Sequence, residues 1–302
     1  MSFKSGFVAL IGPPNSGKST LLNTILGWKL AITSPKPQTT RNRILGVKTT
    51  PEYQAVFLDT PGMHQSNNPL NQALVTVAVE ALAEVDLAVV VTDVFYRRGN
   101  VLDAVIANLN KVNTPVILAL NKVDLVKKQE LLPMLEDLST RRPWEAVVPI
   151  SALTGLQVDD LLQEVAGLLP EGPQYYPEDM DTDQTERFIV SELIREQVFL
   201  KTFDEIPYSA AVVIESFRED EQKGMIFIEA VIQVERESQK GIVIGKQGQK
   251  LKTIGQAARK GIETLLGSRV YLGLHVKVAK NWASDPRALR RLVTDSQKPG
   301  SR

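Results

Sequence analysis

The chain has 302 residues, a length that corresponds to about two domains. Its 43% of hydrophobic and 23% of charged residues match the ordinary globular mix, which excludes a wholly disordered chain. The absence of cysteine excludes disulfides, cysteine-ligated zinc and a thiol nucleophile, and no apolar run reaches the roughly 18 residues of a transmembrane helix. We therefore expect a soluble, cytoplasmic protein.

The net charge of zero hides an uneven distribution along the chain. Residues 1–185 contain 15 basic and 20 acidic residues, whereas residues 186–302 contain 20 basic and 15 acidic ones. Within 236–291 the counts are 13 and 3, a net charge of +10. Such a basic stretch favours a polyanionic partner such as nucleic acid. The alternative is a solvated basic helix face.

The first 170 residues alternate short apolar runs with helical patterns. The runs that we expect to form strands lie at 6–11, 43–49, 53–58, 86–92, 115–120 and 146–150. The helical patterns lie near 18–27, 69–84, 100–110, 129–140 and 156–168. This alternation predicts an α/β domain with a mostly parallel, doubly wound sheet whose ligands bind at the carboxyl ends of the strands. The connection between the second and third runs is too short for a helix, so we expect one antiparallel hairpin there.

A Pro-rich, acidic segment at 173–184 separates this domain from the rest of the chain. It has no hydrophobic periodicity, and the composition changes across it. These features predict a linker between a first domain at 1–172 and a second domain at 185–302.

The second domain shows a smaller α+β pattern. Thr185 is a candidate N-cap for a helix with an apolar face. The expected strands lie at 210–216, 225–234 and 269–278. A glycine-containing turn and a helix to about Leu266 stand before the last strand, and a basic helix ends the chain. The predicted order is therefore α-β-β-α-β-α.

A phosphate-binding loop is predicted directly after the first strand, where a helix begins. Its GxxxxGK[ST] pattern is carried by Gly12, Pro13, Pro14, Asn15, Ser16, Gly17, Lys18 and Ser19, followed by Thr20. Glycines let backbone N–H groups wrap phosphates, and the helix N-terminus favours an anion. Lys18 is expected to reach the β- and γ-phosphates, and the Ser19 hydroxyl to ligate Mg²⁺.

Three more strand ends carry residues that suit a guanine nucleotide. The first ends in Asp59, Thr60, Pro61 and Gly62, the second in Asn121, Lys122, Val123 and Asp124, and the third in Ser151, Ala152 and Leu153. Asp59 can hold Mg²⁺ through water, and a backbone N–H of the third segment can face the guanine 6-keto oxygen. A buried Asp124 can accept two hydrogen bonds from guanine, a donor pair that adenine lacks. Together these motifs predict a GTP site and resemble the translation-factor-related GTPases.

The loop before the hairpin predicts a switch. It contains Gln38, Thr39, Thr40, Arg41 and Asn42. A Thr hydroxyl there can coordinate Mg²⁺ only while the γ-phosphate is present, and we choose Thr40 over Thr39. An ordinary surface loop is the alternative. We expect a second switch at 61–70.

The sequence does not show which residue positions the attacking water. In Ras-like GTPases a Gln after the Asp-x-x-Gly turn has this role, and Met63 stands at that position. The chain thus resembles GTPases with a hydrophobic residue there, in several of which a phosphate-loop Asn supports a bound K⁺. Asn15 has that place, so K⁺ assistance is one hypothesis and an Asn that only shapes the loop is the other. We predict slow intrinsic hydrolysis, well under about 10 s⁻¹.

A Gly-x-x-Gly turn lies at the start of a helix inside the basic stretch. Such a turn presents backbone N–H groups to phosphates, and KH modules use it to grip about four single-stranded nucleotides. The candidate RNA contacts are Ile242, Ile244, Gly245, Lys246, Gln247, Gly248, Lys250 and Lys252. The two isoleucines are expected to form an apolar floor for bases. Aromatic stacking is not evident, so we expect readout by hydrogen bonds to base edges.

The motifs PNSGKST, QTTR, DTPG, NKVD, SAL and IGKQG, in this order, resemble the Era family of bacterial GTPases over nearly the whole chain. The resemblance implies a P-loop GTPase domain followed by a type II KH domain. It also implies binding of the 3′ end of 16S rRNA and a role in 30S subunit maturation, with GTP-gated access to RNA. Some members associate peripherally with the inner membrane, although we find no lipidation motif or amphipathic anchor here. Ser16 stands where relatives often carry Val.

Two other functions fit the same residues. The protein is then either a GTPase whose basic domain docks on a protein or a membrane without RNA specificity, or an RNA-binding protein whose nucleotide is structural. Binding that falls with salt but ignores sequence would indicate general phosphate attraction. No obligate protein partner can be deduced from the sequence.

Overall fold

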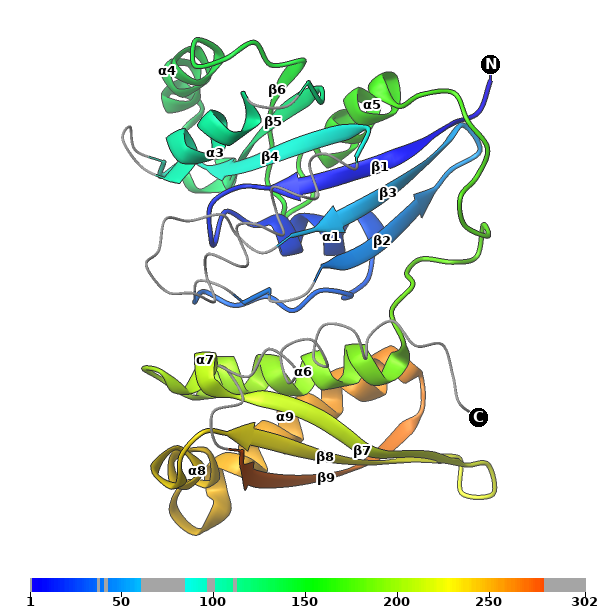
Figure 1. The fold of residues 1–302 in the computed structure, drawn as a ribbon, viewed down its shortest axis with the longest axis vertical. Helices are drawn as coiled ribbons and strands as arrows, with labels where there is room; N and C mark the ends of the chain where they lie inside the picture. Colours follow the sequence, from blue (N-terminus) through cyan, green and yellow to red (C-terminus); the bar gives the residue numbers. More distant parts are fainter. Residues whose placement is uncertain are drawn as a thin grey trace. The chain divides into compact units, whose positions relative to one another are not determined.

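The computed structural model describes residues 2–36, 39–40, 43–60, 85–96, 101–110 and 113–279. The chain divides into two compact units, Met1–Asp183 and Gln184–Arg302 (Figure 1). In the described ranges no helix combines the length and the apolar character that crossing a bilayer requires. The helix expected at 69–84 and the basic C-terminal helix lie outside the described residues.

The first unit is built on a six-stranded sheet with the order β2-β3-β1-β4-β5-β6. Its strands are β1 (Lys4–Ile11), β2 (Ile44–Thr49), β3 (Tyr53–Asp59), β4 (Leu87–Asp93), β5 (Val116–Asn121) and β6 (Ala146–Pro149). Only the β2–β3 pair in this sheet is antiparallel, which confirms the predicted hairpin and the mostly parallel sheet. Because β1, β3, β4 and β5 run parallel, their carboxyl ends meet at one edge, where ligands of such sheets bind.

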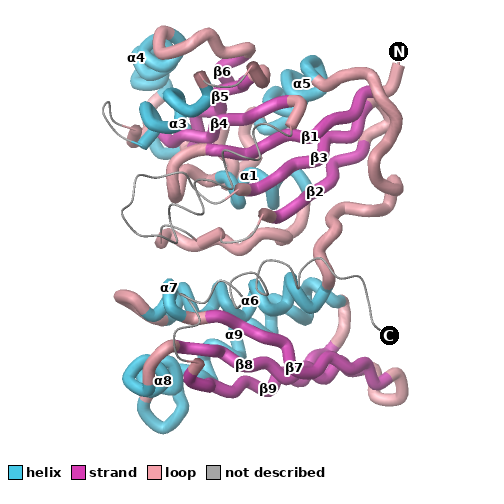
Figure 2. Tube along the Cα trace, in the orientation of Figure 1, coloured by secondary structure: helices cyan, strands magenta, loops and turns pink. Residues whose placement is uncertain are grey.

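Helices cover this sheet, as Figure 2 shows. They are α1 (Lys18–Leu26), α3 (Val101–Leu109), α4 (Lys128–Ser139) and α5 (Val158–Leu168). Every residue of β5 is buried, as expected for a strand covered on both faces. One core cluster joins Val90 and Leu118 of the sheet to Leu102 and Val105 of α3. This packing fixes the strand ends that carry the predicted motifs.

Residues 173–183, the greater part of the predicted linker, lie along the first unit. Gln54 is buried in β3, and its side-chain oxygen accepts hydrogen bonds from the N–H groups of Tyr175 and Tyr176, at 2.8 and 3.0 Å. The same side chain donates to the Tyr176 carbonyl oxygen at 2.9 Å. The boundary between the units therefore falls after Asp183, at the C-terminal end of the predicted linker.

The second unit packs helices on one face of a three-stranded sheet with the order β7-β8-β9. The strands are β7 (Ala211–Asp220), β8 (Met225–Val234) and β9 (Arg269–Val278), with β7–β8 antiparallel and β8–β9 parallel. The helices are α6 (Glu186–Lys201), α7 (Ile206–Ser209), α8 (Glu237–Ile244) and α9 (Gln249–Leu266). The predicted N-cap is confirmed, because the Thr185 hydroxyl accepts a hydrogen bond from the Phe188 N–H at 3.2 Å.

The predicted element order of this unit is corrected at two places, since α7 and α8 were not expected. Helix α7 has only four residues and begins around Pro207. Helix α8 contains Gly241 and a β-branched run, Ile242-Val243-Ile244, which disfavour a helix prediction. The start of α8 is fixed by Gln239. Its side-chain oxygen accepts hydrogen bonds from the backbone N–H groups of Glu235 and Arg236, which precede the helix, at 2.9 and 3.2 Å. Two adjacent helices, α8 and α9, therefore flank the Gly-x-x-Gly turn.

Candidate functional site

The phosphate-binding loop joins β1 to α1 at the carboxyl edge of the first sheet. Gly12 and Gly17 have φ values of +143° and +102°. A Cβ atom on Gly12 would lie 2.2 Å from the Val91 carbonyl oxygen, and one on Gly17 would lie 2.1 Å from the Asn121 amide nitrogen. Only glycine fits either position. The main chain of the loop is therefore held directly against the ends of β4 and β5.

Lys18, the first residue of α1, is buried. Its ammonium group donates hydrogen bonds to the carbonyl oxygens of Gly12 and Pro13, at 3.2 and 2.8 Å, so the side chain folds back over the loop. Burial lowers the pKa of Lys18 from 10.5 to about 8, although the Asp59 carboxylate opposes the shift. A desolvated cation at a helix N-terminus is stabilised by an anion, and phosphate oxygens meet this requirement.

Three side-chain oxygens converge beside Lys18. The Ser19 hydroxyl donates to Asp59 Oδ2 at 2.6 Å and lies 2.8 Å from Thr40 Oγ1. Thr40 also donates to Asp59 Oδ2, at 3.4 Å. Thr39, by contrast, donates to a neighbouring loop carbonyl at 2.9 Å. Of the two candidate threonines, the structure brings Thr40 to this cluster.

The Asp59 carboxylate is buried, and burial raises its pKa from 3.8 to about 6. The Ser19 hydrogen bond, the Lys18 charge and the Thr40 hydrogen bond oppose this rise. The second oxygen, Asp59 Oδ1, has no hydrogen-bond partner in the described part of the chain. A buried carboxylate with an unpaired oxygen next to two hydroxyl groups is a donor set that suits a hard cation. The residues present therefore fit the Mg²⁺ that the sequence predicts.

Asn121 joins three of the predicted motifs. Its side-chain nitrogen donates to the Ser16 carbonyl oxygen at 2.7 Å, and its side-chain oxygen accepts from the N–H groups of Lys122 and Ala152 at 2.7 and 2.8 Å. Asn121, Ser16, Ala152 and the neighbouring Ser151 are all buried. The phosphate loop, the end of β5 and the loop after β6 are thus held together by one side chain.

Asp124 is exposed, so the expectation that this carboxylate is buried is wrong. The chain turns away from the sheet at Lys122, which has a φ of 65°, and Asp124 lies in the short 3₁₀ helix that follows. The Lys122 ammonium forms an ion pair with Asp93 at the end of β4, at 2.7 Å. The Val123 side chain is buried, whereas Leu153 is 79% exposed. The Asp124 carboxylate is consequently accessible to the N–H groups of a guanine base.

The rest of the predicted nucleotide site divides into described and undescribed positions. Asn15 is exposed, has a φ of 60°, and its side-chain nitrogen donates to the Pro35 carbonyl oxygen at 2.9 Å, which ties the phosphate loop to the switch loop. Pro14 lies beside Asn15, and Thr20 lies in the first turn of α1. The Thr60 hydroxyl donates to the Leu10 carbonyl oxygen at 2.9 Å. The positions outside the described residues are Gln38, Arg41, Asn42, Pro61, Gly62 and Met63.

The Gly-x-x-Gly turn joins α8 to α9 in the second unit. Gly245, Gln247 and Gly248 have φ values of 71°, 50° and 75°. A Cβ atom on Gly245 would lie 2.7 Å from the Cβ of Lys250, so the turn closes tightly against the first turn of α9. Gly248 is the N-cap of α9, and Lys246 and Gln247 are exposed at the tip. The N–H groups in the first turn of a helix suit an anion such as an RNA phosphate.

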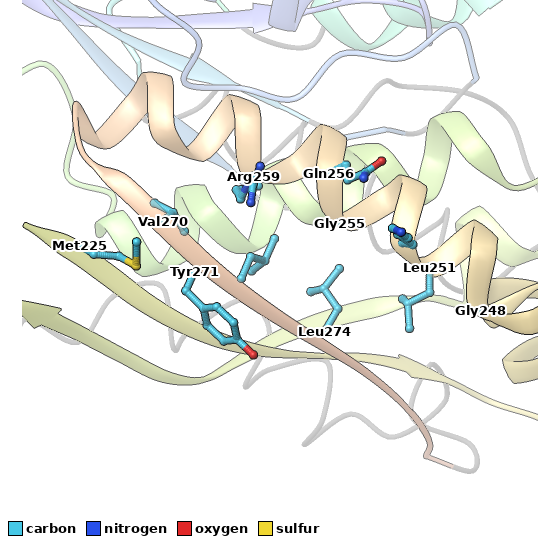
Figure 3. Close-up of a pocket in the computed structure, with 11 residues that line it drawn as sticks. Met225, Gly248, Leu251, Gly255, Gln256, Arg259, Val270, Tyr271 and Leu274 are labelled. Atoms are coloured by element: carbon cyan, nitrogen blue, oxygen red, sulfur yellow. The ribbon is translucent and has the colours of Figure 1, made fainter. Parts of the chain in front are cut away.

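A groove of about 510 Å³ continues from this turn between α9 and β9 (Figure 3). Leu251, Lys252 and Leu274 line it near the turn, and Arg259 and Tyr271 line its far part. Ile242 and Ile244, which we expected to form an apolar floor for bases, lie on the unexpected helix α8 and are not among the residues that line this groove.

Sequence reasoning missed Arg259 and Tyr271 as lining residues of this groove. The seven-residue spacing of Lys252 and Arg259 on one helix face is a signal for the arginine. Ile242 is 44% exposed, and Ile244 packs against the core of the unit.

Comparison with family models agrees with this division of the chain. Residues 7–122 match the model described as 50S ribosome-binding GTPase, and residues 205–283 match the KH domain model. The fold and the two sites therefore define a P-loop GTPase that carries a KH domain.

Relatives of known identity narrow this class. GTPase Era of Geobacter metallireducens is 51% identical over 290 residues, 96% of this chain and 97% of the relative, and GTPase Era of Geotalea daltonii is 50% identical over 288 residues, 95% and 97%. Two solved structures each have a TM-score of 0.90 and 40% identity and cover 95% of this chain and 98% of theirs. One is an Aquifex aeolicus Era variant bound to GDP·AlF₄⁻, and the other is Era with MgGDPNP and nucleotides 1506–1542 of 16S rRNA. The chain belongs to the Era family of GTP-hydrolysing enzymes.

Proposed function

We propose that this protein is a GTP-binding and GTP-hydrolysing switch that binds the 3′ end of 16S rRNA through its KH domain. In this role it assists maturation of the 30S subunit in the cytoplasm. The observation that carries the proposal is the presence of two complementary sites in one chain. The buried cluster of Lys18, Ser19 and Asp59 suits a metal-bound triphosphate, and the Gly-x-x-Gly turn with its groove suits single-stranded RNA.

The first unit supports the nucleotide part of the proposal. Lys18 would contact the β- and γ-phosphates, and Asp124 would accept hydrogen bonds from guanine. Ser19, Thr40 and, through water, Asp59 would hold Mg²⁺, which neutralises phosphate charge when bound. Thr40 belongs to the loop that leads into β2, so contact with the γ-phosphate would hold this loop and hydrolysis would release it.

The second unit supports the RNA part. The turn places the start of α9 and the exposed Lys246 where phosphates bind, and Lys252 adds charge beside the groove. The apolar lining from Leu251 and Leu274 gives bases a surface away from water. A related Era has been solved with RNA from the 3′ end of 16S rRNA, which supports the same ligand here.

RNA titrations of the full chain test this function. The two RNAs are the segment that corresponds to nucleotides 1506–1542 of 16S rRNA and a scrambled RNA of equal length. We expect the real sequence to bind about tenfold tighter or more, since each lost base contact weakens such complexes measurably. The double variant Lys246→Asp/Gln247→Asp should lose this binding, because carboxylates at the tip of the turn repel phosphates.

The matched control for that variant is Lys260→Asp, which inverts an exposed charge on α9 outside the groove. It should keep the preference for the real sequence. Equal affinity of the wild-type protein for both RNAs would contradict specific rRNA binding and favour the alternative, a basic domain that docks on a protein or a membrane.

We also propose that K⁺ assists hydrolysis through the side chain of Asn15. Its amide nitrogen is engaged by the Pro35 carbonyl, an arrangement that fixes the side chain at the mouth of the phosphate loop. GTP hydrolysis measured in KCl and in NaCl of equal ionic strength tests this, and a higher rate in KCl that Asn15→Ala abolishes is expected. Equal rates in the two salts would leave Asn15 as a residue that shapes the loop.

Peripheral association with the inner membrane stays a prediction from the family resemblance. Co-sedimentation with vesicles of phosphatidylethanolamine and phosphatidylglycerol tests it. A bound fraction that survives moderate salt would support a membrane contact, whereas complete release would indicate attraction to the anionic headgroups alone.

A further inference from the structure

Among the described residues, the helices of the second unit pack on one face of its sheet and none packs on the other, which we call the helix-free face. Along β8, Ile226 and Ile228 point into the core, whereas Phe227 between them is only half-buried. Residues on neighbouring strands that pair in register share a face. Phe227 pairs with Arg218 on β7 and with Tyr271 on β9, so these three side chains form one row across the helix-free face.

The two aromatic rings of this row, exposed Tyr271 and half-buried Phe227, form a pair. The centroids of Phe227 and Tyr271 are 5.7 Å apart, with an angle of 37° between the ring planes. The Lys223 ammonium lies 5.5 Å from the centroid of the Phe227 ring. Tyr271 is 51% exposed. Because tyrosine rings usually bury a large area in a core or an interface, an exposed ring indicates a binding surface. An exposed ring beside a half-buried one, with a cation next to them, offers a surface on which flat bases stack.

Cationic and acidic side chains both stand around the pair. Arg218, Lys223 and Arg269 are exposed, and Arg269 stands on the next row of the same face, paired with Met225. Asp220 lies 3.3 Å from the Lys223 ammonium, Glu221 is exposed in the same turn, and Glu229, on the row beyond Phe227, lies 3.7 Å from His275. Among the described residues neither Arg218 nor Arg269 forms an ion pair, so these two guanidinium groups can contact a phosphate backbone.

The patch is continuous with the RNA groove. Met225 and Tyr271 belong to the helix-free face and also line the groove between α9 and β9. Figure 3 shows Leu274 between α9 and β9, while Tyr271 points from β9 away from α9. Since β9 is an edge strand, no further strand of the sheet separates the groove from the open face. An RNA strand that leaves the groove at its Tyr271 end therefore reaches the aromatic pair next.

We propose that Phe227 and Tyr271, with Arg218, Lys223 and Arg269, form a second binding surface for single-stranded RNA. RNA that occupies the groove continues over the edge of β9, and its bases stack on the two rings while the three cations contact its phosphates. This inference rests on the proposed RNA binding by the groove and extends it. Stacking of this kind tolerates different bases, so the surface adds affinity and length to the site rather than sequence specificity.

A nested set of RNAs tests the proposal on the full-length protein. The segment corresponding to nucleotides 1506–1542 of 16S rRNA is shortened from each end, and the affinity of every RNA is measured for wild-type protein, Phe227→Ala and Tyr271→Ala. For RNAs long enough to pass the groove, each variant should bind about tenfold more weakly than wild type. For RNAs confined to the groove, Phe227→Ala should bind like wild type, because Phe227 does not line the groove. Tyr271→Ala is compared on the long RNAs alone, because Tyr271 also lines the far part of the groove.

Two conservative variants serve as matched controls. Tyr271→Phe keeps the ring and should bind like wild type. Val213→Ala removes two methyl groups from a 37% exposed residue on the same face, at the opposite end of β7, and should also leave affinity unchanged. Arg218→Gln and Arg269→Gln should each lower the salt dependence of binding to the long RNA by about one phosphate contact.

The outcomes separate this inference from the function on which it rests. If Tyr271→Ala and Phe227→Ala bind long RNA like wild type while Lys246→Asp/Gln247→Asp does not bind, the groove binds RNA and the second surface is refuted. A patch that serves a protein partner gives this same result. An equal loss for Phe227→Ala on short and long RNAs would make Phe227 a part of the groove site and would also refute the proposal. If the turn variant binds RNA like wild type, the proposed function itself fails.

Discussion

The nucleotide site and the RNA surface use opposite physical means. In the first unit, Lys18, Asp59 and Asn121 are buried, and each makes hydrogen bonds to neighbouring polar groups that hold it in one position. In the second unit, exposed residues such as Lys246 and Lys252 surround an open, partly apolar groove. A buried polar group that loses its partner costs far more free energy than an exposed charge that loses one contact. Substitutions should therefore act steeply in the first unit and gradually in the second.

The largest effect is expected for Lys18→Met. Loss of a charge-assisted contact to phosphate should weaken GTP binding by about 100-fold or more. Because burial lowers the pKa of Lys18 to about 8, the same variant should make the nucleotide-free protein more stable, by about 1–2 kcal/mol at pH 7. Nucleotide titration and denaturant unfolding measure the two effects. Lys128→Met, an exposed control, should change neither, and a destabilised Lys18→Met protein would contradict the account.

Asn121→Ala should come next, with a loss of about 3 kcal/mol in the free energy of unfolding. The substitution leaves the Ser16 carbonyl and the N–H groups of Lys122 and Ala152 without their partner. Urea unfolding of the nucleotide-free protein measures it. Ser139→Ala, which removes an exposed hydrogen bond within α4, is the control and should change stability by about 0.5 kcal/mol at most. A small effect at Asn121 would show that the three motifs do not depend on this side chain.

The nucleotide-free protein should also show an unusual dependence of stability on pH. Burial raises the pKa of Asp59 to about 6, so the folded state holds more protons than the unfolded state between about pH 4 and 6, and stability falls as the pH rises through this range. The pKa of Lys18 is lowered to about 8, so stability rises with pH between about 8 and 10.5. Each effect is about 2–3 kcal/mol.

Comparison with variants isolates these two contributions. The fall in stability between pH 4 and 6 should be absent in Asp59→Asn, and the rise above pH 8 should be absent in Lys18→Met. Unfolding free energies measured across the pH range provide the test. Identical pH profiles for wild type and variants would show that these groups are not desolvated as the structure indicates.

The smallest effects are expected in the RNA surface. Lys250→Gln and Lys252→Gln should each weaken RNA binding about two- to fivefold and lower the salt slope by about one. Lys260→Gln, on the same helix but outside the groove, is the matched control and should bind like wild type. A 100-fold loss of RNA affinity from either substitution would show that single residues of the RNA surface matter as much as those of the nucleotide site.

Much of the fold follows from local signals in the sequence. Buried apolar runs predicted all six strands of the first sheet, because strands covered on both faces are rich in consecutive apolar side chains. Helix α8 was not predicted because Gly241 and the three β-branched residues after it have low helix propensity. The packing of Val243 in the core of the unit stabilises the helix despite this propensity. Short elements such as α7 carry too few residues for a periodic signal.

The site residues also divide into those that a local motif predicts and those that depend on contacts between distant parts of the chain. The glycine and lysine positions of the phosphate loop follow from a contiguous motif, and the structure places them together. The junction formed by Asn121 could not be predicted, since it depends on contacts with residues 31 and 105 positions away. No sequence motif marks Tyr271 as a candidate RNA contact. Its exposure and its pairing with Phe227 arise only when β8 and β9 align in the folded sheet.

A GTP-dependent switch requires that the nucleotide bound to the first unit sets the affinity of the second unit for RNA. The affinity of the full-length protein for the 3′-terminal 16S rRNA segment is measured with GDP and with a non-hydrolysable GTP analogue, both in the presence of Mg²⁺. We expect tighter binding in the GTP state by about 5- to 150-fold, the usual range of coupling between two sites. Identical affinities in the two nucleotide states would contradict the switch and leave two independent sites in one chain.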